Sequence, residues 1–236
     1  MDDLTHVVVT RLNITRGRDK VWTRKRIDLL LKYCAPSVFA QTHLRFTWIV
    51  LVDASTPAGL QSEILTRLID TQPVRDDMSL IIVPMVSDDW GHSLGEWCKS
   101  NVQSKWVATT RIDSDDAFHP DYLKDIDEVV QPKTELLTFT GGYIFQLPER
   151  TTHHFPRTDT NFQTLVEPTA EAVGAHCEQH GKMKARFPFR VIEKYPRWLV
   201  VRHDNNWHYN RKKKGACPLP QAPVGALDSC FGFLNL

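Results

Sequence analysis

The sequence has few cysteines, no long apolar run and little net charge, and each absence excludes a class of protein. Five widely spaced cysteines without a C-x-x-C pair do not suggest a disulfide framework or a cysteine-rich zinc site. No apolar run is long enough to span a bilayer, and the chain opens with Asp2 and Asp3 rather than a signal segment. A net charge of +1 gives no reason to expect nucleic-acid binding. We therefore expect a cytoplasmic protein with reduced thiols and no nucleic-acid partner.

Three motifs of common nucleotide-binding and hydrolytic folds are also missing. The chain contains neither G-x-x-x-x-G-K-[ST] nor G-x-G-x-x-G, so neither a P-loop nor a dinucleotide-binding fingerprint is supported. It has no G-x-S-x-G, which argues against an α/β-hydrolase. A length of 236 residues suits a single domain with a substantial core.

The sequence does contain an alternation of apolar strands and amphipathic helices. Runs of β-branched and apolar residues predict the strands, and apolar residues at three- and four-residue intervals predict the helices. Such alternation implies right-handed crossovers and an α/β fold with a mostly parallel central sheet and flanking helices. Strands are predicted at residues 6–11, 46–52, 80–86, 105–110, 136–140 and 196–203, and helices are predicted to begin near Trp22, Pro57, Leu94 and Pro120.

The second half of the chain is less regular, and we separate it from residues 1–147. Residues 151–156 are expected to form a loop, and a helix is expected from Glu167 to about His180. His176 and His180 would share a face of that helix, but no third zinc ligand is apparent, so a polar helix end is favoured. In the first half, Pro36 is expected to kink or restart its helix.

Three carboxylates follow the fourth predicted strand within four residues. Asp113, Asp115 and Asp116 come directly after Arg111 and Ile112. Buried carboxylates are costly unless a positive charge neutralises them, and Mg²⁺ and Mn²⁺ prefer hard oxygen ligands. The alternative is a solvated turn that caps the next helix. We favour the metal site, because parallel sheets bind ligands where their strands end.

Other polar residues follow predicted strands and are expected at the same edge. Arg11 is either a surface charge or a partner of the carboxylates. Asp53 is either an N-cap for the next helix or an acceptor for a nucleobase or ribose group. His203 is either an ordinary buried histidine or an additional Mn²⁺ ligand from the last strand.

The chain contains a series of short segments whose order is informative. They are residues 9–13, 33–38 with Gln41, 46–48, 52–53, 110–116, 161–162, 165–167 and 196–199, followed by His203 and Asn206, and they span most of the chain. In this order they resemble the bacterial "putative rhamnosyl transferase" family, whose members look like GT-A glycosyltransferases. One departure is Arg197, where the family pattern leads us to expect an apolar residue.

The resemblance implies that residues 1–147 bind a UDP- or dTDP-linked sugar and that residues 148–236 bind a glycan or lipid-linked saccharide acceptor. It implies a single GT-A domain and a Mn²⁺ or Mg²⁺ ion that bridges the carboxylates and the donor diphosphate. The implied donor-binding residues are Thr10, Arg11, Asp53, Arg111, Asp113 and Ser114, and the implied metal ligands are Asp113, Asp115, Asp116 and His203.

An inverting transfer also needs a carboxylate base within reach of the acceptor hydroxyl. Glu167 is the first candidate, Asp204 the second and Glu171 the third. A retaining transfer does not need a base in that place, and the sequence leaves the choice open.

Two other functions stay open at this point. The same aspartates could serve a Mg²⁺-dependent phosphohydrolase or nucleotidyltransferase, or the chain could be a glycan-binding module without activity. The basic run that begins at Arg211 is either a solvated loop or a contact with an anionic acceptor or the inner face of a membrane.

Overall fold

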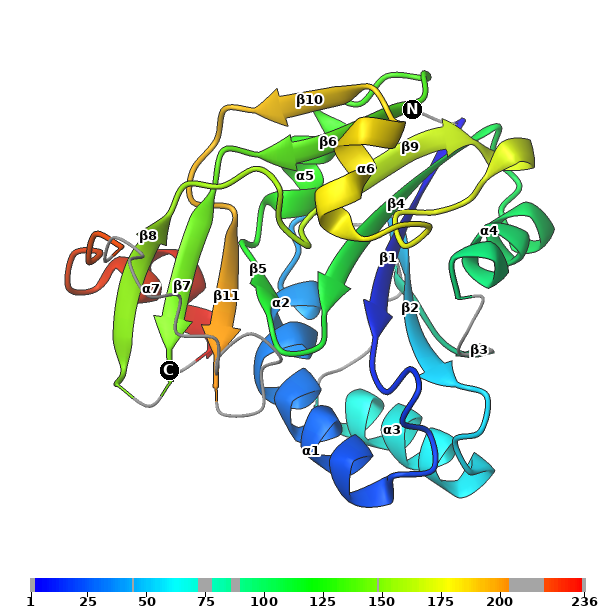
Figure 1. The fold of residues 1–236 in the computed structure, drawn as a ribbon, viewed down its shortest axis with the longest axis horizontal. Coiled ribbons are helices and arrows are strands. Elements are labelled where there is room, and N and C mark those ends of the chain that lie inside the picture. Colours follow the sequence, from blue (N-terminus) through cyan, green and yellow to red (C-terminus); the bar gives the residue numbers. More distant parts are fainter. Residues whose placement is uncertain are drawn as a thin grey trace.

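The protein, described here by a computed structural model, has a seven-stranded sheet between two layers of helices, with a four-stranded sheet beside it (Figure 1). The structure describes residues 3–43, 45–71, 78–85, 90–147, 149–203 and 219–234. Within these ranges no helix combines the length and the apolar character needed to cross a membrane.

The large sheet is mostly parallel, as predicted. Its strand order is β10-β6-β9-β4-β1-β2-β3, and β9 alone among these seven strands runs against its neighbours. The central strands carry β-branched residues that are fully buried, such as Val7, Val8 and Val9. The strands are β1 (Leu4–Arg11), β2 (Phe46–Asp53), β3 (Met78–Met85), β4 (Trp106–Asp113), β6 (Glu135–Phe139), β9 (Thr164–Pro168) and β10 (Phe189–Ile192).

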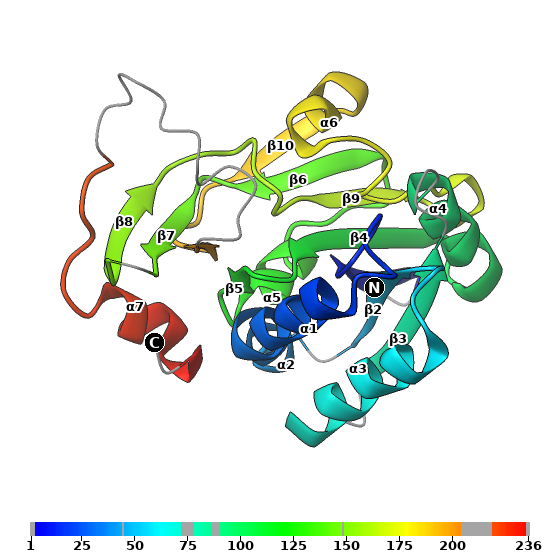
Figure 2. The same cartoon turned by 60° about the horizontal axis from the view of Figure 1, so that its bottom comes forward.

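Helices cover both faces of this sheet, which explains why its strands are apolar on both sides (Figure 2). One core contains Ile27, Ile64 and Ile126 from the helices of the first face, and another contains Leu94 and Cys98 from the second. The first face carries α1 (Lys20–Leu29), α2 (Ala35–Phe39), α3 (Ala58–Thr71) and α5 (Tyr122–Asp127), and the second carries α4 (Trp90–Asn101) and α6 (His180–Arg186).

The first helix passes Pro36 by a change of helix type. A π-helical turn, η1 (Leu30–Cys34), joins α1 to α2, and Pro36 lies in the first turn of α2. The chain stays helical from Lys20 to Phe39, and Cys34 and Ala35 both have right-handed helical backbone angles. The helix therefore continues past Pro36 through a local change of hydrogen-bond pattern rather than a break.

The smaller sheet joins segments from both halves of the sequence. Its strand order is β5-β11-β7-β8, and it packs on α7 (Ala226–Phe231) and η3 (Gly232–Leu234) through a core that includes Leu199 and Phe231. The division at residue 147 therefore does not separate the two sheets. The strands are β5 (Ala117–Phe118), β7 (Gly142–Gln146), β8 (Thr151–Phe155) and β11 (Trp198–Arg202).

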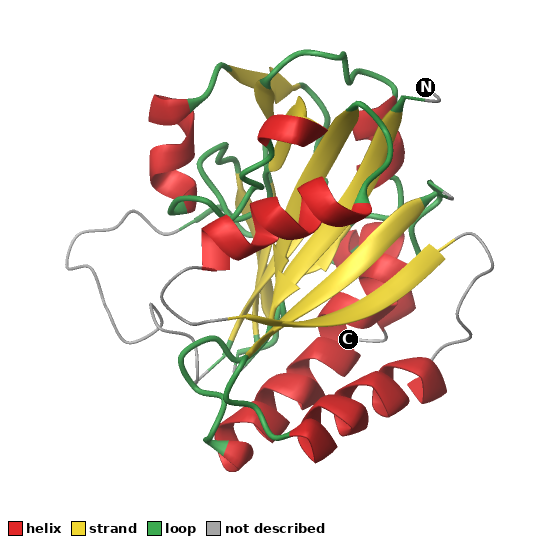
Figure 3. Ribbon diagram, turned by 90° about the vertical axis from the view of Figure 1, so that its right-hand side faces the viewer, coloured by secondary structure: helices red, strands yellow, loops and turns green. Residues whose placement is uncertain are grey.

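Two predictions for the second half are wrong. Residues 151–155 form strand β8 rather than a loop, because they pair with β7. Glu167 lies in strand β9 rather than in a helix, and only a short 3-10 turn, η2 (Thr169–Glu171), follows before α6 begins at His180. Strand β9 and helix α6 are labelled in Figure 1, and Figure 3 shows the strands of the fold in yellow and its helices in red. His176 precedes that helix, so the two histidines do not share a helix face.

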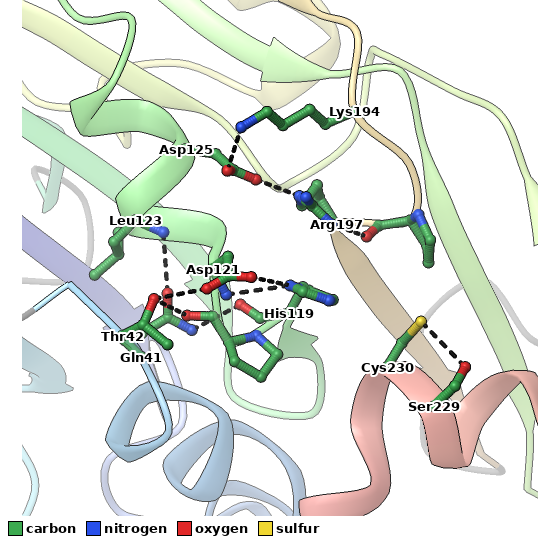
Figure 4. A network of polar contacts seen from close by, with 12 residues as sticks. Gln41, Thr42, His119, Asp121, Leu123, Asp125, Lys194, Arg197, Ser229 and Cys230 are labelled. Atoms are coloured by element: carbon green, nitrogen blue, oxygen red, sulfur yellow. Dashed lines mark hydrogen bonds and ion pairs between the residues drawn. The ribbon is translucent and has the colours of Figure 1, made fainter.

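Arg197, the departure from the family pattern, has a partner in α5. Its Nε donates to Oδ2 of Asp125, whose other oxygen accepts from Lys194 Nζ at 2.5 Å (Figure 4). Asp125 is buried, so these two positive charges neutralise a carboxylate that would otherwise be costly. Arg197 therefore links the segment before β11 to α5.

Candidate functional site

The carboxyl ends of β1 and β4 lie side by side and bring charged residues together. Arg11 and Asp113 are register partners at the last position of the two strands. Arg11 Nη2 lies 3.7 Å from Asp113 Oδ1, and the two side chains are 30% and 34% exposed. This partly exposed pair marks the edge of the sheet where the sequence predicts donor binding.

Asp115 is buried beside this edge, and its carboxylate contacts the side chains of Arg26 and His203. The guanidinium of Arg26 on α1 donates from Nη1 to Oδ2 and from Nη2 to Oδ1, both at 3.0 Å. His203 Nε2, at the end of β11, lies 3.0 Å from the same Oδ2. Asp115 and His203, two of the predicted metal ligands, thus lie in direct contact, and Arg26 contacts the same carboxylate.

The surroundings keep Asp115 ionised. Burial alone would raise the pKa of this carboxyl, but the hydrogen bond from His203 and the charge of Arg26 together hold the pKa below its usual value. Burial opposes the charge on Arg26 as well, yet Asp115 raises its pKa. The Arg26 guanidinium also lies over the ring of Trp22, 5.7 Å from its centre. Arg26 is therefore a fixed cation at the end of β4.

Asp116 and Ser114 are held inside the protein. Asp116 Oδ2 accepts from Asn161 Nδ2 at 2.7 Å, and Oδ1 accepts from the backbone N–H of Val201 at 3.0 Å. Burial and the nearby Asp115 and Asp113 carboxylates raise the pKa of Asp116 well above its usual value. Asp116 therefore ties β4 to β11 and the segment before β9, while Ser114 Oγ accepts from Arg26 Nη2 at 2.5 Å.

The donor atoms at this edge suit Mn²⁺ or Mg²⁺, but their arrangement does not. Carboxylate oxygens and an imidazole are acceptable ligands for these ions. In the described ranges, no three side chains of the Asp113–Asp116 segment and His203 bring ligand atoms within 4.8 Å of one another. Both oxygens of Asp115 already face Arg26. As arranged, the protein's own guanidinium supplies the neutralising charge that the sequence led us to expect from a metal.

Asp53 supports the loop between β1 and α1. Its Oδ2 accepts from the backbone N–H of Thr15 at 2.8 Å, and its Oδ1 accepts from the N–H and hydroxyl of Ser55 at 2.9 and 2.6 Å. Thr15 has a φ of 68°, which is unfavourable for a β-branched residue, so this bond holds a strained turn. A nucleobase contact by Asp53 stays a prediction.

Thr10 and Arg111 direct their side chains into the protein. The Thr10 hydroxyl accepts from Trp48 Nε1 at 3.0 Å. Arg111 is 2% exposed, and its Nη1 approaches the carbonyl oxygens of Ala175 and Glu178 at 3.5 and 3.4 Å. Burial lowers the pKa of Arg111 to about 10. The Thr10 side chain therefore supports the sheet, and the Arg111 side chain supports the layer on the second face of the sheet. Neither side chain supports the Arg11–Asp113 edge.

Glu167 lies near the opposite end of β4 from the Asp113–Asp116 segment. It is the register partner of Val107, six residues before Asp113, which corresponds to about 20 Å along a strand. Its carboxylate accepts from the backbone N–H groups of Val173 and Gly174 at 3.0 and 2.7 Å. This geometry does not support Glu167 as the catalytic base. Asp204, the second candidate, and the basic run at Arg211 lie outside the described residues.

A pocket of about 270 Å³ opens beside His203. It lies between His203 and one face of α1 and η1, which together contribute two lysines and one carboxylate. The lining residues are Lys25, Asp28, Leu29, Lys32, Tyr33, Leu147 and His203.

The sequence-based site did not include Arg26 or Asn161. Asn161 directly precedes the buried Phe162, and only the pairing of β9 with β4 brings its amide to Asp116. Arg26 belongs to a basic stretch in which Arg24 and Lys25 are equally good candidates from sequence alone. The orientation of α1 over the end of β4 selects Arg26, and no local pattern signals it.

Comparisons with known proteins give a family and several weak likenesses to solved structures. No curated protein matches the chain. Solved structures with weak overall likeness include a putative nucleotide-diphospho-sugar transferase from Desulfovibrio desulfuricans, at 10% identity, with 99% of this chain and 93% of that chain covered and a TM-score of 0.44. Another is a mannosyltransferase from Pyrobaculum calidifontis in complex with GDP-Man and Mn²⁺, at 12% identity, with 87% of this chain and 59% of that chain covered and a TM-score of 0.46.

The family assignment rests on the sequence itself. The model of the family described as "Putative rhamnosyl transferase" matches residues 18–215. This range contains Arg26, the Asp113–Asp116 segment, Asn161 and His203. The chain therefore belongs to the "Putative rhamnosyl transferase" family and is a glycosyltransferase.

Proposed function

We propose that the protein transfers a sugar from a UDP- or dTDP-linked donor to a hydroxyl group of a glycan or lipid-linked saccharide. Rhamnose is the first sugar to test, because the family description names it. The donor diphosphate lies at the carboxyl ends of β1 and β4, next to Arg11 and Arg26. The observation that carries this proposal is the convergence of Arg26 and His203 on Asp115 beside the partly exposed Arg11–Asp113 pair.

The charge distribution suits the departure of a nucleoside diphosphate. Negative charge grows on the leaving phosphate, and fixed positive charges at that point lower the barrier. Arg11 is 30% exposed and can contact a ligand directly, whereas Arg26 is 14% exposed and is fixed by Asp115 and Ser114. Arg11 therefore binds the diphosphate, and Arg26 sets the electrostatic field of the site.

A divalent cation on Asp113, Asp115 and His203 is a second proposal, separate from sugar transfer. The donor atoms have the right chemistry, but Arg26 has to leave Asp115 before an ion can take its place. A metal ion at this place therefore competes with Arg26 for Asp115. A Mn²⁺ titration of the wild-type protein and of a variant without Arg26 tests whether it binds.

The acceptor enters through the pocket beside His203. Its lining combines apolar surface from Leu29 and Leu147 with the positive charges of Lys25 and Lys32, which suits a saccharide that carries acidic groups. Asp28 is the carboxylate in this lining and replaces Glu167 as the candidate base of an inverting transfer. Asp28 Oδ1 also accepts a hydrogen bond from Arg67 Nη2 at 2.8 Å, and the Asp28 side chain is 64% exposed.

A donor panel tests the proposal. The protein is incubated with UDP- and dTDP-linked sugars, with Mn²⁺ or with EDTA, and released nucleoside diphosphate is measured together with the thermal shift. We expect release from at least one donor and at least a tenfold loss in Asp115→Asn, with Asp70→Asn as a control on the exposed face of α3. Absence of both release and thermal shift with every donor would overturn the proposal. Consumption of a nucleoside triphosphate with release of pyrophosphate would indicate a nucleotidyltransferase instead.

Variants of the pocket test the acceptor arm. Asp28→Asn is expected to lower the transfer rate and leave donor binding unchanged, since the base acts on the acceptor hydroxyl. Lys32→Gln is expected to raise the KM for an acidic acceptor more than for a neutral one. Unchanged transfer in both variants would exclude this pocket as the acceptor site.

A further inference from the structure

Three potential metal ligands meet at the start of β1, which is the end opposite to the Arg11–Asp113 edge. They are His6, His43 and Asp127, and each offers a ligand atom that lies within 4.8 Å of the other two. His6 is in β1, His43 precedes β2, and Asp127 is the last residue of α5. Five residues separate His6 from Arg11, or roughly 16 Å along the strand, so this cluster is distinct from the proposed donor site.

His6 is a buried imidazole whose polar contact in the described part of the chain is the carboxylate of Asp127. Its side chain is 3% exposed, and neither ring nitrogen has a hydrogen-bond partner there. The nearest carboxylate oxygen is Asp127 Oδ1, 3.6 Å from Nε2. A buried polar group left in this way is destabilising. A metal ion that accepts the lone pair of one imidazole nitrogen satisfies that nitrogen.

His43 already has the hydrogen bond that orients a metal-binding histidine. Its Nε2 lies 3.1 Å from the carbonyl oxygen of Arg45. A carbonyl only accepts hydrogen bonds, so Nε2 carries the proton and Nδ1 of the neutral ring keeps its lone pair. A backbone carbonyl commonly plays this role behind metal-bound histidines. The rings of His43 and His6 are 4.8 Å apart between centres and tilted by 51°.

The segment that carries His43 is fixed against α5, which carries Asp127. Thr42 donates from its backbone N–H to the carbonyl of Pro120 at 2.9 Å and from its hydroxyl to Asp121 Oδ1 at 2.8 Å (Figure 4). Gln41 Oε1 accepts from the N–H of Leu123 at 3.0 Å. Because these bonds hold the two segments together, the ligand atoms are brought close before any ion binds.

We propose that His6, His43 and Asp127 bind a divalent first-row transition ion of the Zn²⁺ type, with water completing the shell. Two imidazoles and one carboxylate favour Zn²⁺ over Mg²⁺ or Ca²⁺, which prefer oxygen ligands alone. Asp127 is 42% exposed, so the site is open to solvent on one side. The ion fastens β1, the segment before β2 and α5 to one another and has a structural role. The inference does not depend on the proposed sugar transfer.

Zinc titration of the metal-free protein tests the site. Calorimetry with Zn²⁺ counts the bound equivalents, and Co²⁺ in place of Zn²⁺ gives a visible absorption band that reports the geometry. The variants are His43→Gln and Asp127→Asn, because both side chains reach the surface and leave the core intact. The controls are His92→Gln, on an exposed part of α4, and Asp115→Asn, at the donor edge. Thermal unfolding in EDTA verifies that every variant folds as the wild-type protein does.

The expected result is one Zn²⁺ equivalent that is lost in His43→Gln and bound at least about tenfold more weakly in Asp127→Asn. The same equivalent should persist in His92→Gln and in Asp115→Asn. Zn²⁺ should also raise the melting temperature of the wild-type protein and of both controls, but not of His43→Gln. Absence of Zn²⁺ binding in the wild-type protein, or unchanged binding in both ligand variants, would overturn the inference.

Discussion

Arg26 and Asp115 form a two-point ion pair across 89 residues of sequence, with both N–H···O distances at 3.0 Å. The pair joins the first helix to the end of the fourth strand. It places a permanent positive charge where the sequence predicts a metal. The edge where we propose that the donor binds therefore has a fixed positive charge that the chain itself supplies.

Removal of Arg26 should be far more damaging than removal of a neighbouring arginine. Arg26→Met leaves Asp115 buried without its cation, and loss of one partner of a buried pair costs about 3–5 kcal/mol. Arg24 on the same helix pairs with Glu63 at the surface, with side-chain exposures of 58% and 31%. Arg24→Met should therefore change stability by less than about 1 kcal/mol. Urea unfolding measures both, and equal effects would show that the Arg26–Asp115 pair has no special weight.

The same variant tests the metal prediction. If Asp113, Asp115 and His203 bind Mn²⁺, Arg26 competes with the ion for Asp115. Arg26→Met should then bind Mn²⁺ at least about tenfold more tightly than the wild-type protein, which corresponds to about 1.4 kcal/mol. Mn²⁺ binding is followed by electron paramagnetic resonance, with Arg24→Met as the control. Equal affinity with and without Arg26 would speak against a metal at this edge.

Glu167 should prove to be a structural residue. In Glu167→Gln, one of the two backbone N–H groups of Val173 and Gly174 loses its acceptor, which costs about 1–3 kcal/mol. The rate of sugar transfer per folded molecule should not change, because Glu167 lies near the start of β4. Glu193→Gln, at an exposed position after β10, serves as the control and should change neither quantity. A large loss of rate without loss of stability would restore the role of Glu167 as the base.

The first half of the fold could be predicted because its signals are local. Phe46–Asp53 is an almost uninterrupted apolar run up to Asp53 and forms β2, and the four-residue spacing of Leu60, Ile64 and Leu68 marks the buried face of α3. Strand β9 has no comparable signal. It is five residues long, ends in Pro168, and is stabilised by antiparallel pairing with β4 and β6, which a single sequence does not reveal.

The same distinction holds for the site. Asp113 and His203 were found because polar residues that end an apolar strand lie at the edge of a sheet. Arg26 reaches that edge through the length of its side chain and the tilt of α1, which depend on packing. The sequence therefore predicts which site residues the strands place at the edge of the sheet. The residues that a neighbouring helix adds to the site are found only from the structure.

Two glycines should respond in opposite ways to a methyl group. A Cβ on Gly142, in β7, would lie 2.0 Å from the carbonyl oxygen of Trp198 and 2.5 Å from its ring. Gly142→Ala should lower stability by about 3 kcal/mol or more, since β7 and the neighbouring strand β11 must move apart. A Cβ on Gly59, in α3, meets nothing within 4 Å. Gly59→Ala should therefore raise stability by about 0.5–1 kcal/mol, and a reversed order in chemical unfolding would refute this account of the packing.

His176 should make stability fall on mild acidification. The side chain is fully buried, and burial together with the charges of Arg111 and Arg11 holds its pKa well below the usual value. Below about pH 6.5 the unfolded chain takes up a proton that the folded protein refuses. Stability is therefore complete above that pH and declines by about 1.4 kcal/mol for each unit below it, until the folded pKa is reached.

The variant His176→Gln separates the effect of the His176 imidazole on the pH dependence of stability from the effect of the carboxylates. The free energy of unfolding is measured in urea at several pH values between about 5 and 8 for the wild-type protein and for His176→Gln, with the exposed His92→Gln as the control. The variant loses stability at pH 8 through imperfect packing, but its curve should be flatter below pH 6.5. The wild-type and His92→Gln curves should run in parallel. If the His176→Gln curve also runs parallel to them, the buried imidazole does not titrate as its surroundings indicate.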